Sequence, residues 1–138
     1  MKRLVGIDYG RKRLGIAMTD TLGITVQGWP TFTASGFEDA VKQVLSFLSE
    51  HDVGSIVVGL PLNMDGSRGD MAEEADRFGS ALRERSGIEV VFWDERLTSE
   101  QAKRLLKQGG RGRRRLGEVD RVAAALMLES YLRANPIR

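Results

Sequence analysis

Residues 53–60, Val-Gly-Ser-Ile-Val-Val-Gly-Leu, form a continuous run without charge that ends at Pro61. A run of this kind is typical of a strand in a parallel sheet that is covered on both faces. A second run, residues 88–93, follows a helical pattern that begins near Asp70 and ends at Gly87. A strand, a helix and a strand in this order predict a parallel pair with a helix packed against it. We therefore expect an α/β fold.

The first residues predict an antiparallel hairpin that belongs to the same sheet. Residues 4–8 are a short apolar strand, Gly10 allows the chain to turn, and residues 14–18 return as a second strand. The further expected elements are extended segments at 24–26 and 29–33, a helix over 37–48 behind a capping box at 35–38, a helix after the capping box at 98–101, and a last helix from about 120 to 133. Together they predict a mixed five-stranded sheet flanked by helices, in one domain that spans residues 1–138.

The charges of the chain are divided unevenly along its length. Residues 1–95 carry 10 basic and 15 acidic side chains, whereas residues 96–138 carry 11 basic and 4 acidic side chains. A cationic last third favours a polyanionic partner such as nucleic acid. The chain has no cysteine, which excludes disulfides and thiolate zinc sites and is compatible with the cytoplasm. We also expect no membrane association, because no apolar run approaches the length of a membrane span.

Acidic residues stand at the ends of the predicted elements. Asp8 ends the first strand, Asp94 and Glu95 directly follow residues 88–93, and Asp120 is expected to open the last helix. Because ligands gather at the carboxyl ends of parallel strands, these acids are expected to meet at one edge of the sheet. Each acid also has a structural explanation: Asp8 as a turn residue, Asp94 or Glu95 in a salt bridge with the next arginine, and Asp120 as a helix N-cap.

Three carboxylates without histidine or cysteine form a set of hard oxygen ligands, which suits Mg²⁺ or Mn²⁺. Two such ions about 3.5–4 Å apart can bind a scissile phosphate, activate water and stabilise the leaving oxygen. The pattern therefore predicts hydrolysis of phosphodiester bonds, with Asp8 as the most rigidly mounted acid.

Basic and polar side chains near these acids are the predicted contacts to phosphate. They lie in the first hairpin turn, in the glycine-bearing loop 63–69, beside Glu95, and in the arginine-rich segment before Asp120. The predicted nucleic-acid-binding residues are Arg11, Lys12, Arg13, Asn63, Ser67, Arg68, Arg96, Lys107, Arg111, Arg113, Arg114 and Arg115.

These motifs resemble the YqgF/RuvX family of Holliday junction resolvases and pre-ribosomal-RNA nucleases. The resemblance is carried by residues 6–10 with 15–17, by 58–66, by 94–98 with Glu100 and Ala102, and by Asp120 with 123–124. It implies a ribonuclease H-like fold, a metal-dependent nuclease, and Asp8, Glu95 and Asp120 as the catalytic acids and metal ligands. Asp94 is an alternative ligand to Glu95. Residues 113–119 are richer in arginine than the family pattern, which bears on the substrate preference.

The resemblance leaves two substrates open. One is the 5′ region of precursor 16S ribosomal RNA, which is the favoured expectation, and the other is a four-way DNA junction. Junction cleavage requires a homodimer that presents two sites, whereas RNA trimming is open to a monomer. Two other classes of protein remain as alternatives. An ATP-binding domain of the actin and sugar-kinase type would need a second similar domain, and a non-catalytic nucleic-acid-binding module would gain nothing from acids that repel phosphate.

Overall fold

The computed structural model describes residues 2–98 and 116–136, which are built around a five-stranded sheet with the order β3-β2-β1-β4-β5. The strands are β1 (Arg3–Asp8), β2 (Arg13–Thr19), β3 (Val26–Thr33), β4 (Val53–Leu60) and β5 (Glu89–Asp94). The helices are α1 (Phe37–Ser49), α2 (Asp70–Ser86), the 3-10 turn η1 (Glu95–Leu97) and α4 (Leu116–Ala134). None of the described helices is of a length and apolar content that would let it cross a bilayer.

The sheet is mixed, as the sequence predicts. Strands β1, β2 and β3 pair antiparallel, whereas β1, β4 and β5 run parallel to one another. The parallel strands therefore end at the same edge of the sheet, where Asp8 is the last residue of β1 and Asp94 the last residue of β5. This edge is the one at which the acids were expected.

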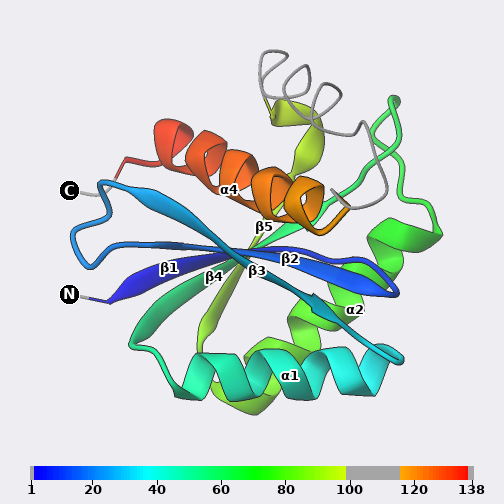
Figure 1. Cartoon of the computed structure of the whole chain (residues 1–138). Coiled ribbons are helices and arrows are strands. Elements are labelled where there is room, and N and C mark those ends of the chain that lie inside the picture. Colours follow the sequence, from blue (N-terminus) through cyan, green and yellow to red (C-terminus); the bar gives the residue numbers. More distant parts are fainter. Residues whose placement is uncertain (1, 99–115, 137–138) are drawn as a thin grey trace.

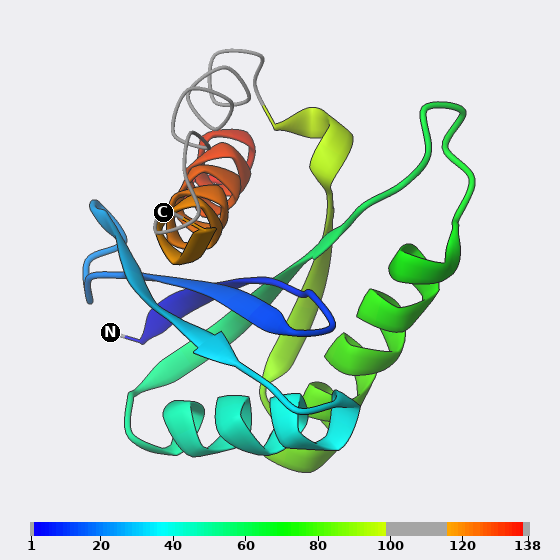
Figure 2. The same ribbon diagram turned by 45° about the vertical axis from the view of Figure 1, so that its right-hand side comes forward.

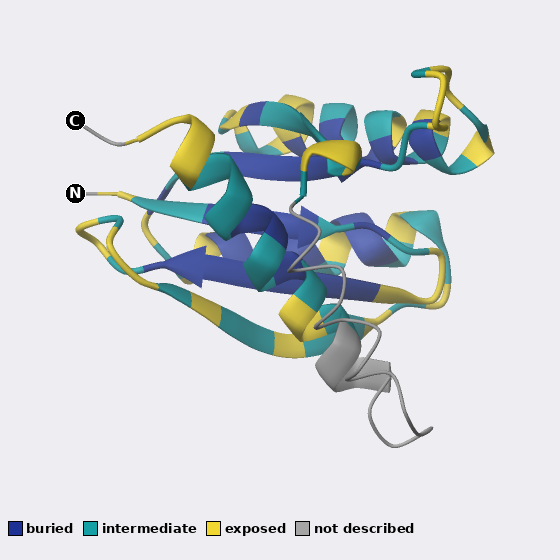
Figure 3. Cartoon of the chain, turned by 90° about the horizontal axis from the view of Figure 1, so that it is seen from above, coloured by how far each residue is buried: buried dark blue, intermediate teal, exposed yellow. Residues whose placement is uncertain are grey.

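Helices cover both faces of the sheet: α4 lies on one face, and α1 and α2 lie on the other (Figures 1 and 2). Side chains alternate between the two faces along each strand. In β1, Val5 and Ile7 belong to the core cluster that includes residues of α1 and α2, while a Cβ on Gly6 would lie 3.1 Å from the Leu128 Cβ of α4. Most residues of β2 and β4, and residues 5–7 of β1, are consequently buried between two helical layers, and Figure 3 shows buried residues in dark blue.

The structure corrects the expected boundaries. Residues 24–26 and 29–33 do not form two segments, because β3 is one strand paired to β2 with a register shift between Leu14 and Ile16. Gly28 and Pro30 are accommodated within it because β3 is an edge strand. Helix α4 begins at Leu116, so Asp120 lies inside the helix and does not open it.

The predicted caps differ as well. The N-cap of α1 is Gly36 and makes no side-chain cap hydrogen bond; instead the carboxylate of Asp39 accepts a hydrogen bond from the Ser35 N–H at 2.9 Å. Gly69 is the N-cap of α2, which makes Asp70 the first helical residue and not the cap. Thr98 follows η1 as its C-cap, and the helix predicted after it falls outside the described residues.

Candidate active site

The predicted acids lie on the face of the sheet that α4 covers, with Glu95 beside Gly59 and Met127. Asp8 lies two residues beyond Gly6 and thus shares the face that α4 covers. Glu95 lies two residues beyond Trp93, whose ring packs edge-on against Tyr131 of α4 at 5.7 Å. Asp120 belongs to α4 itself. Three residues from distant parts of the chain are thereby brought to the same edge and the same side of the sheet.

Asp8 and Glu95 are in direct contact through a side-chain hydrogen bond. Burial raises the pKa of Glu95 to about 8, and the nearby charge of Asp8 adds to the effect. Burial also raises the pKa of Asp8, and the charge of Asp120 acts in the same direction, while the hydrogen bond from Glu95 opposes it. The hydrogen bond raises the pKa of Glu95 and lowers that of Asp8, so Glu95 is its donor and Asp8 its acceptor.

Asp120, on α4, lies near this pair and forms an ion pair with Arg13. The Nε of Arg13 donates a hydrogen bond to Asp120 Oδ2 at 2.7 Å. Asp8 thus interacts with both other acids. Within residues 2–98 and 116–136, no three acidic or histidine side chains are arranged to hold a metal ion.

Asp94 is separated from this group by the pleat of β5. It follows Trp93 by one residue and so belongs to the opposite face of the strand. Its carboxylate accepts hydrogen bonds from the side chain of Arg96, the shortest at 2.7 Å, and one from the Arg96 N–H at 3.0 Å. The hydrogen bonds from the Arg96 side chain are the main reason that the pKa of Asp94 is lowered. The expected salt bridge with the next arginine is therefore formed by Asp94, and Glu95 is the residue that contacts Asp8.

Two glycines allow the acids to come this close. A Cβ on Gly15, the β2 partner of Asp8, would lie 2.3 Å from the backbone oxygen of Asp120. A Cβ on Gly59 of β4 would lie 2.4 Å from Glu95 Oε1 and 2.7 Å from Met127 Sδ. Real Cβ atoms do not approach other atoms so closely. Gly15 therefore sets the height of α4 above the sheet, and Gly59 provides the space for the Glu95 carboxylate.

The residue after Asp8 anchors the hairpin turn to the other helical layer. Tyr9 is buried, and its hydroxyl donates a hydrogen bond to Glu74 Oε1 of α2 at 2.7 Å. Arg11 binds the second oxygen of Glu74 at 2.9 Å. Burial together with the contact to Glu74 raises the pKa of Tyr9, which keeps the hydroxyl protonated as a donor. Sequence reasoning missed this network; its signal was a tyrosine and an arginine flanking a turn glycine.

The hairpin turn forms one wall of a cavity of about 360 Å³ beside the acids, lined by residues 8–13 and Asp120. The predicted phosphate-binding residues of this turn differ in whether their side chains already form ion pairs within the protein. Arg11 is bound to Glu74 and Arg13 to Asp120, whereas Lys12 is exposed and contributes its backbone oxygen to Ala34. Asp8 and Asp120 therefore line the same cavity as the cations of the turn.

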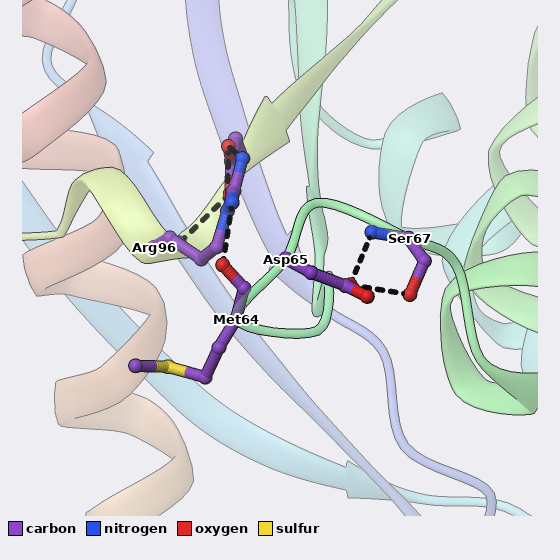
Figure 4. A network of polar contacts seen from close by, with 5 residues as sticks. Met64, Asp65, Ser67 and Arg96 are labelled. Atoms are coloured by element: carbon purple, nitrogen blue, oxygen red, sulfur yellow. Dashed lines mark hydrogen bonds and ion pairs between the residues drawn. The ribbon is translucent and has the colours of Figure 1, made fainter.

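The loop between β4 and α2 is held by its own side chains. Gly66 has a φ of 87°, and the amide of Asn63 donates to the hydroxyl of Ser67 at 2.9 Å. Asp65 accepts hydrogen bonds from the N–H and the hydroxyl of Ser67 at 2.9 and 2.6 Å, and Arg96 reaches the carbonyl of Met64 at 3.3 Å (Figure 4). The loop is thus tied to η1, which begins with Glu95.

The other predicted phosphate contacts are placed as follows. Arg68 forms an ion pair with Asp76 of α2. Lys107, Arg111, Arg113, Arg114 and Arg115 lie outside the described residues. The structure therefore brings the turn residues to the acids and binds Asn63, Ser67, Arg68 and Arg96 into contacts within the protein.

Known proteins are similar to this chain in sequence and in fold. A family model described as RuvX, Holliday junction resolvase, matches residues 2–134. A protein of Syntrophus aciditrophicus named "Putative pre-16S rRNA nuclease" is 42% identical over 133 residues, which are 96% of this chain and 89% of that protein. A protein of the same name from Endomicrobium trichonymphae is 43% identical over 134 residues, with 96% of each chain covered.

Solved structures with the same fold include Holliday junction resolvases. RuvC of T. thermophilus in complex with a Holliday junction substrate superposes with a TM-score of 0.61 at 17% identity, covering 98% of this chain and 97% of that one. The Fowlpox virus resolvase in complex with Holliday junction DNA gives a TM-score of 0.58 at 12% identity, covering 98% and 99%. At these identities the similarity is one of fold, and it confirms the expected ribonuclease H-like architecture.

Proposed function

Because the chain belongs to the RuvX family of phosphodiester-hydrolysing enzymes, we propose that it is a single-domain, divalent-metal-dependent nuclease that processes precursor 16S ribosomal RNA. The substrate in this proposal is supported by the names of the relatives that are about 42% identical over nearly the whole chain. Such a substrate would place the protein in the cytoplasm.

One observation carries the proposal: Asp8 interacts with two acids that come from distant parts of the chain. Glu95 donates a hydrogen bond to it, and the charge of Asp120 acts on it. Carboxylates forced together in this way are stabilised by a proton or by a cation. The donors are hard oxygens only, so the set fits Mg²⁺ or Mn²⁺ better than zinc. Asp8, Glu95 and Asp120 are the residues that would hold the metal.

The proposed division of labour follows from these positions. Bound divalent ions would supply the charge that activates water and stabilises the leaving oxygen. The rigid end of β1 orients Asp8, the space beside Gly59 receives Glu95, and the seat of α4 on Gly15 positions Asp120. Lys12, exposed at the cavity wall, offers a charge to the phosphate backbone. A backbone contact of this kind does not read sequence.

A second candidate function is the resolution of four-way DNA junctions. The description of the family and the two resolvase folds support it. This function requires two copies of the site in a homodimer, because the junction is two-fold symmetric. RNA processing is compatible with one copy, so the oligomeric state on each substrate separates the two candidates.

Digestion of both substrates by a pair of matched variants tests the proposal. Asp8→Asn keeps the shape of the side chain but removes the charge, so cleavage in Mg²⁺ or Mn²⁺ should be lost while substrate binding is largely kept. Asp94→Asn is the control, because Asp94 faces away from Asp8 and binds Arg96. This variant should retain most of the activity, and EDTA should stop cleavage by the wild type.

The outcomes separate the candidates. Cutting of the precursor RNA, and not of the junction, by the wild type supports the proposed function, whereas the reverse result supports the resolvase. Purified Asp8→Asn that still cleaves would refute the role of the acids. Equal loss in Asp94→Asn would refute the assignment of Glu95 over Asp94.

A further inference from the structure

We propose that Arg13 is the resident counter-cation of Asp120, that it leaves this acid when a divalent cation binds, and that its released guanidinium then binds a phosphate of the nucleic acid. Arg13 would thereby couple metal binding to substrate binding. This inference rests on the proposed function and adds to it a specific exchange of partners within the site.

The position of Arg13 is fixed by the strand and the helix that it bridges. It is the first residue of β2, and it lies two residues before Gly15 on the face covered by α4. Its Nε is 2.7 Å from Asp120 Oδ2, and the exposed fractions of the two side chains are 41% and 24%. The guanidinium is therefore accessible to a ligand, while the carboxylate is the more enclosed partner.

Among the cations of the hairpin turn, Arg13 forms the ion pair with Asp120, a proposed metal ligand. Arg11 is bound to Glu74, on the other side of the sheet. The backbone of Asp120 is held over β2, because α4 is anchored to the sheet by Ala124, Met127 and Leu128, which are buried. The ion pair is thus broken by movement of the Arg13 side chain, and not by movement of the helix.

The chemistry of the site favours such a movement. A carboxylate that directs an oxygen to a divalent cation has less charge to offer to a guanidinium, and the two cations repel each other. Arg13 also lines the cavity of about 360 Å³, together with Asp8, Asp120 and Lys12. A phosphate that enters this cavity offers the planar, two-oxygen partner that a guanidinium binds best. The released side chain therefore has a new partner within reach.

Metal binding without nucleic acid gives the first test. Calorimetric titration of the full chain with Mn²⁺ should show about two- to fivefold tighter binding by Arg13→Gln, which is the range of an exposed ion pair. Lys12→Gln removes a charge from the same turn without breaking the pair with Asp120, so its effect should be less than half as large. Arg11→Gln should leave the affinity for Mn²⁺ unchanged.

Binding of a labelled precursor ribosomal RNA fragment gives the second test, with anisotropy measured over a range of salt concentrations. In Ca²⁺, used here to occupy the site, Arg13→Gln should weaken binding and lower the slope of log K against log salt by about 1. In EDTA the wild-type Arg13 is held by Asp120, so the same substitution should leave the slope unchanged. Lys12→Gln should lower the slope in both conditions.

The outcomes distinguish failure of the inference alone from failure of the proposed function on which it rests. Unchanged or weaker Mn²⁺ binding by folded Arg13→Gln, or an equal change of slope in Ca²⁺ and EDTA, would overturn the inference alone. Absence of Mn²⁺ binding by the wild type, or equal binding by Asp8→Asn, would overturn the proposed function and the inference together. Arg13→Lys keeps the charge and should fall between the wild type and Arg13→Gln in both tests, which guards against an effect of folding.

Discussion

The substitution Gly59→Ala tests whether the site depends on the exact seat of Glu95 without altering any proposed catalytic group. The new Cβ would lie 2.4 Å from Glu95 Oε1, whereas ordinary van der Waals contact begins near 3.4 Å. The carboxylate must therefore move by about 1 Å, and the sulfur of Met127 must move as well. A displacement of about 1 Å in a reacting group can cost roughly 10²-fold in rate. Overpacking at a buried site costs about 1–3 kcal/mol of stability.

The assay compares kcat on the precursor RNA in saturating Mg²⁺ with the midpoint of thermal unfolding. We expect a fall in kcat of roughly 10²-fold. The midpoint should fall by roughly 3–5 °C for each kcal/mol in a chain of this size. Gly54→Ala is the matched control, since it lies at the other end of β4 and its Cβ would meet the Lys2 side chain, away from the acids. It should keep the wild-type kcat.

A folded Gly59→Ala protein with the kcat of the wild type would refute the reasoning. The double variant Gly59→Ala with Glu95→Asp provides a further check, because the shorter side chain withdraws from the new Cβ. Its kcat should equal that of Glu95→Asp alone, since the two changes act on one contact and do not add. Additive losses would mean that Gly59 acts elsewhere.

Three other substitutions give independent results. In the metal-free protein, the free energy of unfolding should fall as the pH rises from 4.5 to 8, because folded Glu95 keeps a proton that the unfolded chain has lost. Glu95→Gln should flatten this pH dependence in thermal melts. An unchanged slope would contradict the raised pKa of Glu95. Tyr9→Phe removes the hydrogen bond to Glu74 and should lower the free energy of unfolding by about 1–2 kcal/mol in urea titrations; no loss would show that the bond contributes nothing. Gly15→Ala would place a Cβ 2.3 Å from the backbone of Asp120 and should reduce both kcat and the melting temperature, while an unaffected kcat would show that the height of α4 is unimportant.

The fold was largely predictable because its signals are periodic. The uncharged run of 53–60 and the hairpin before it indicated the mixed sheet, and the structure confirms both. The caps were less predictable, since a capping pattern states only which side chains are able to bind a helix end. At α1, Asp39 binds the N–H of Ser35, and the predicted box does not form.

The choice between Asp94 and Glu95 shows where reasoning from sequence reached its limit. Adjacent residues of a strand face opposite sides, so only one of them can meet Asp8. Which side carries α4 is set by packing between residues far apart in the chain, of which Trp93 with Tyr131 is one pair. The same holds for the pair of Arg13 and Asp120, because its formation depends on the height of the helix above Gly15. The catalytic roles of Asp8, Glu95 and Asp120 stay predictions.

The turn between β1 and β2 is fastened to both helical layers at once. Tyr9 holds it to α2 on one side of the sheet, and Arg13 holds it to α4 on the other. A displacement of α2 or of α4 therefore shifts the same few turn residues, which lie next to the acids. Substitutions far from the cavity, on the buried side of α2 for example, should therefore alter the rate of the enzyme through this double tether, even where they leave every acid in place.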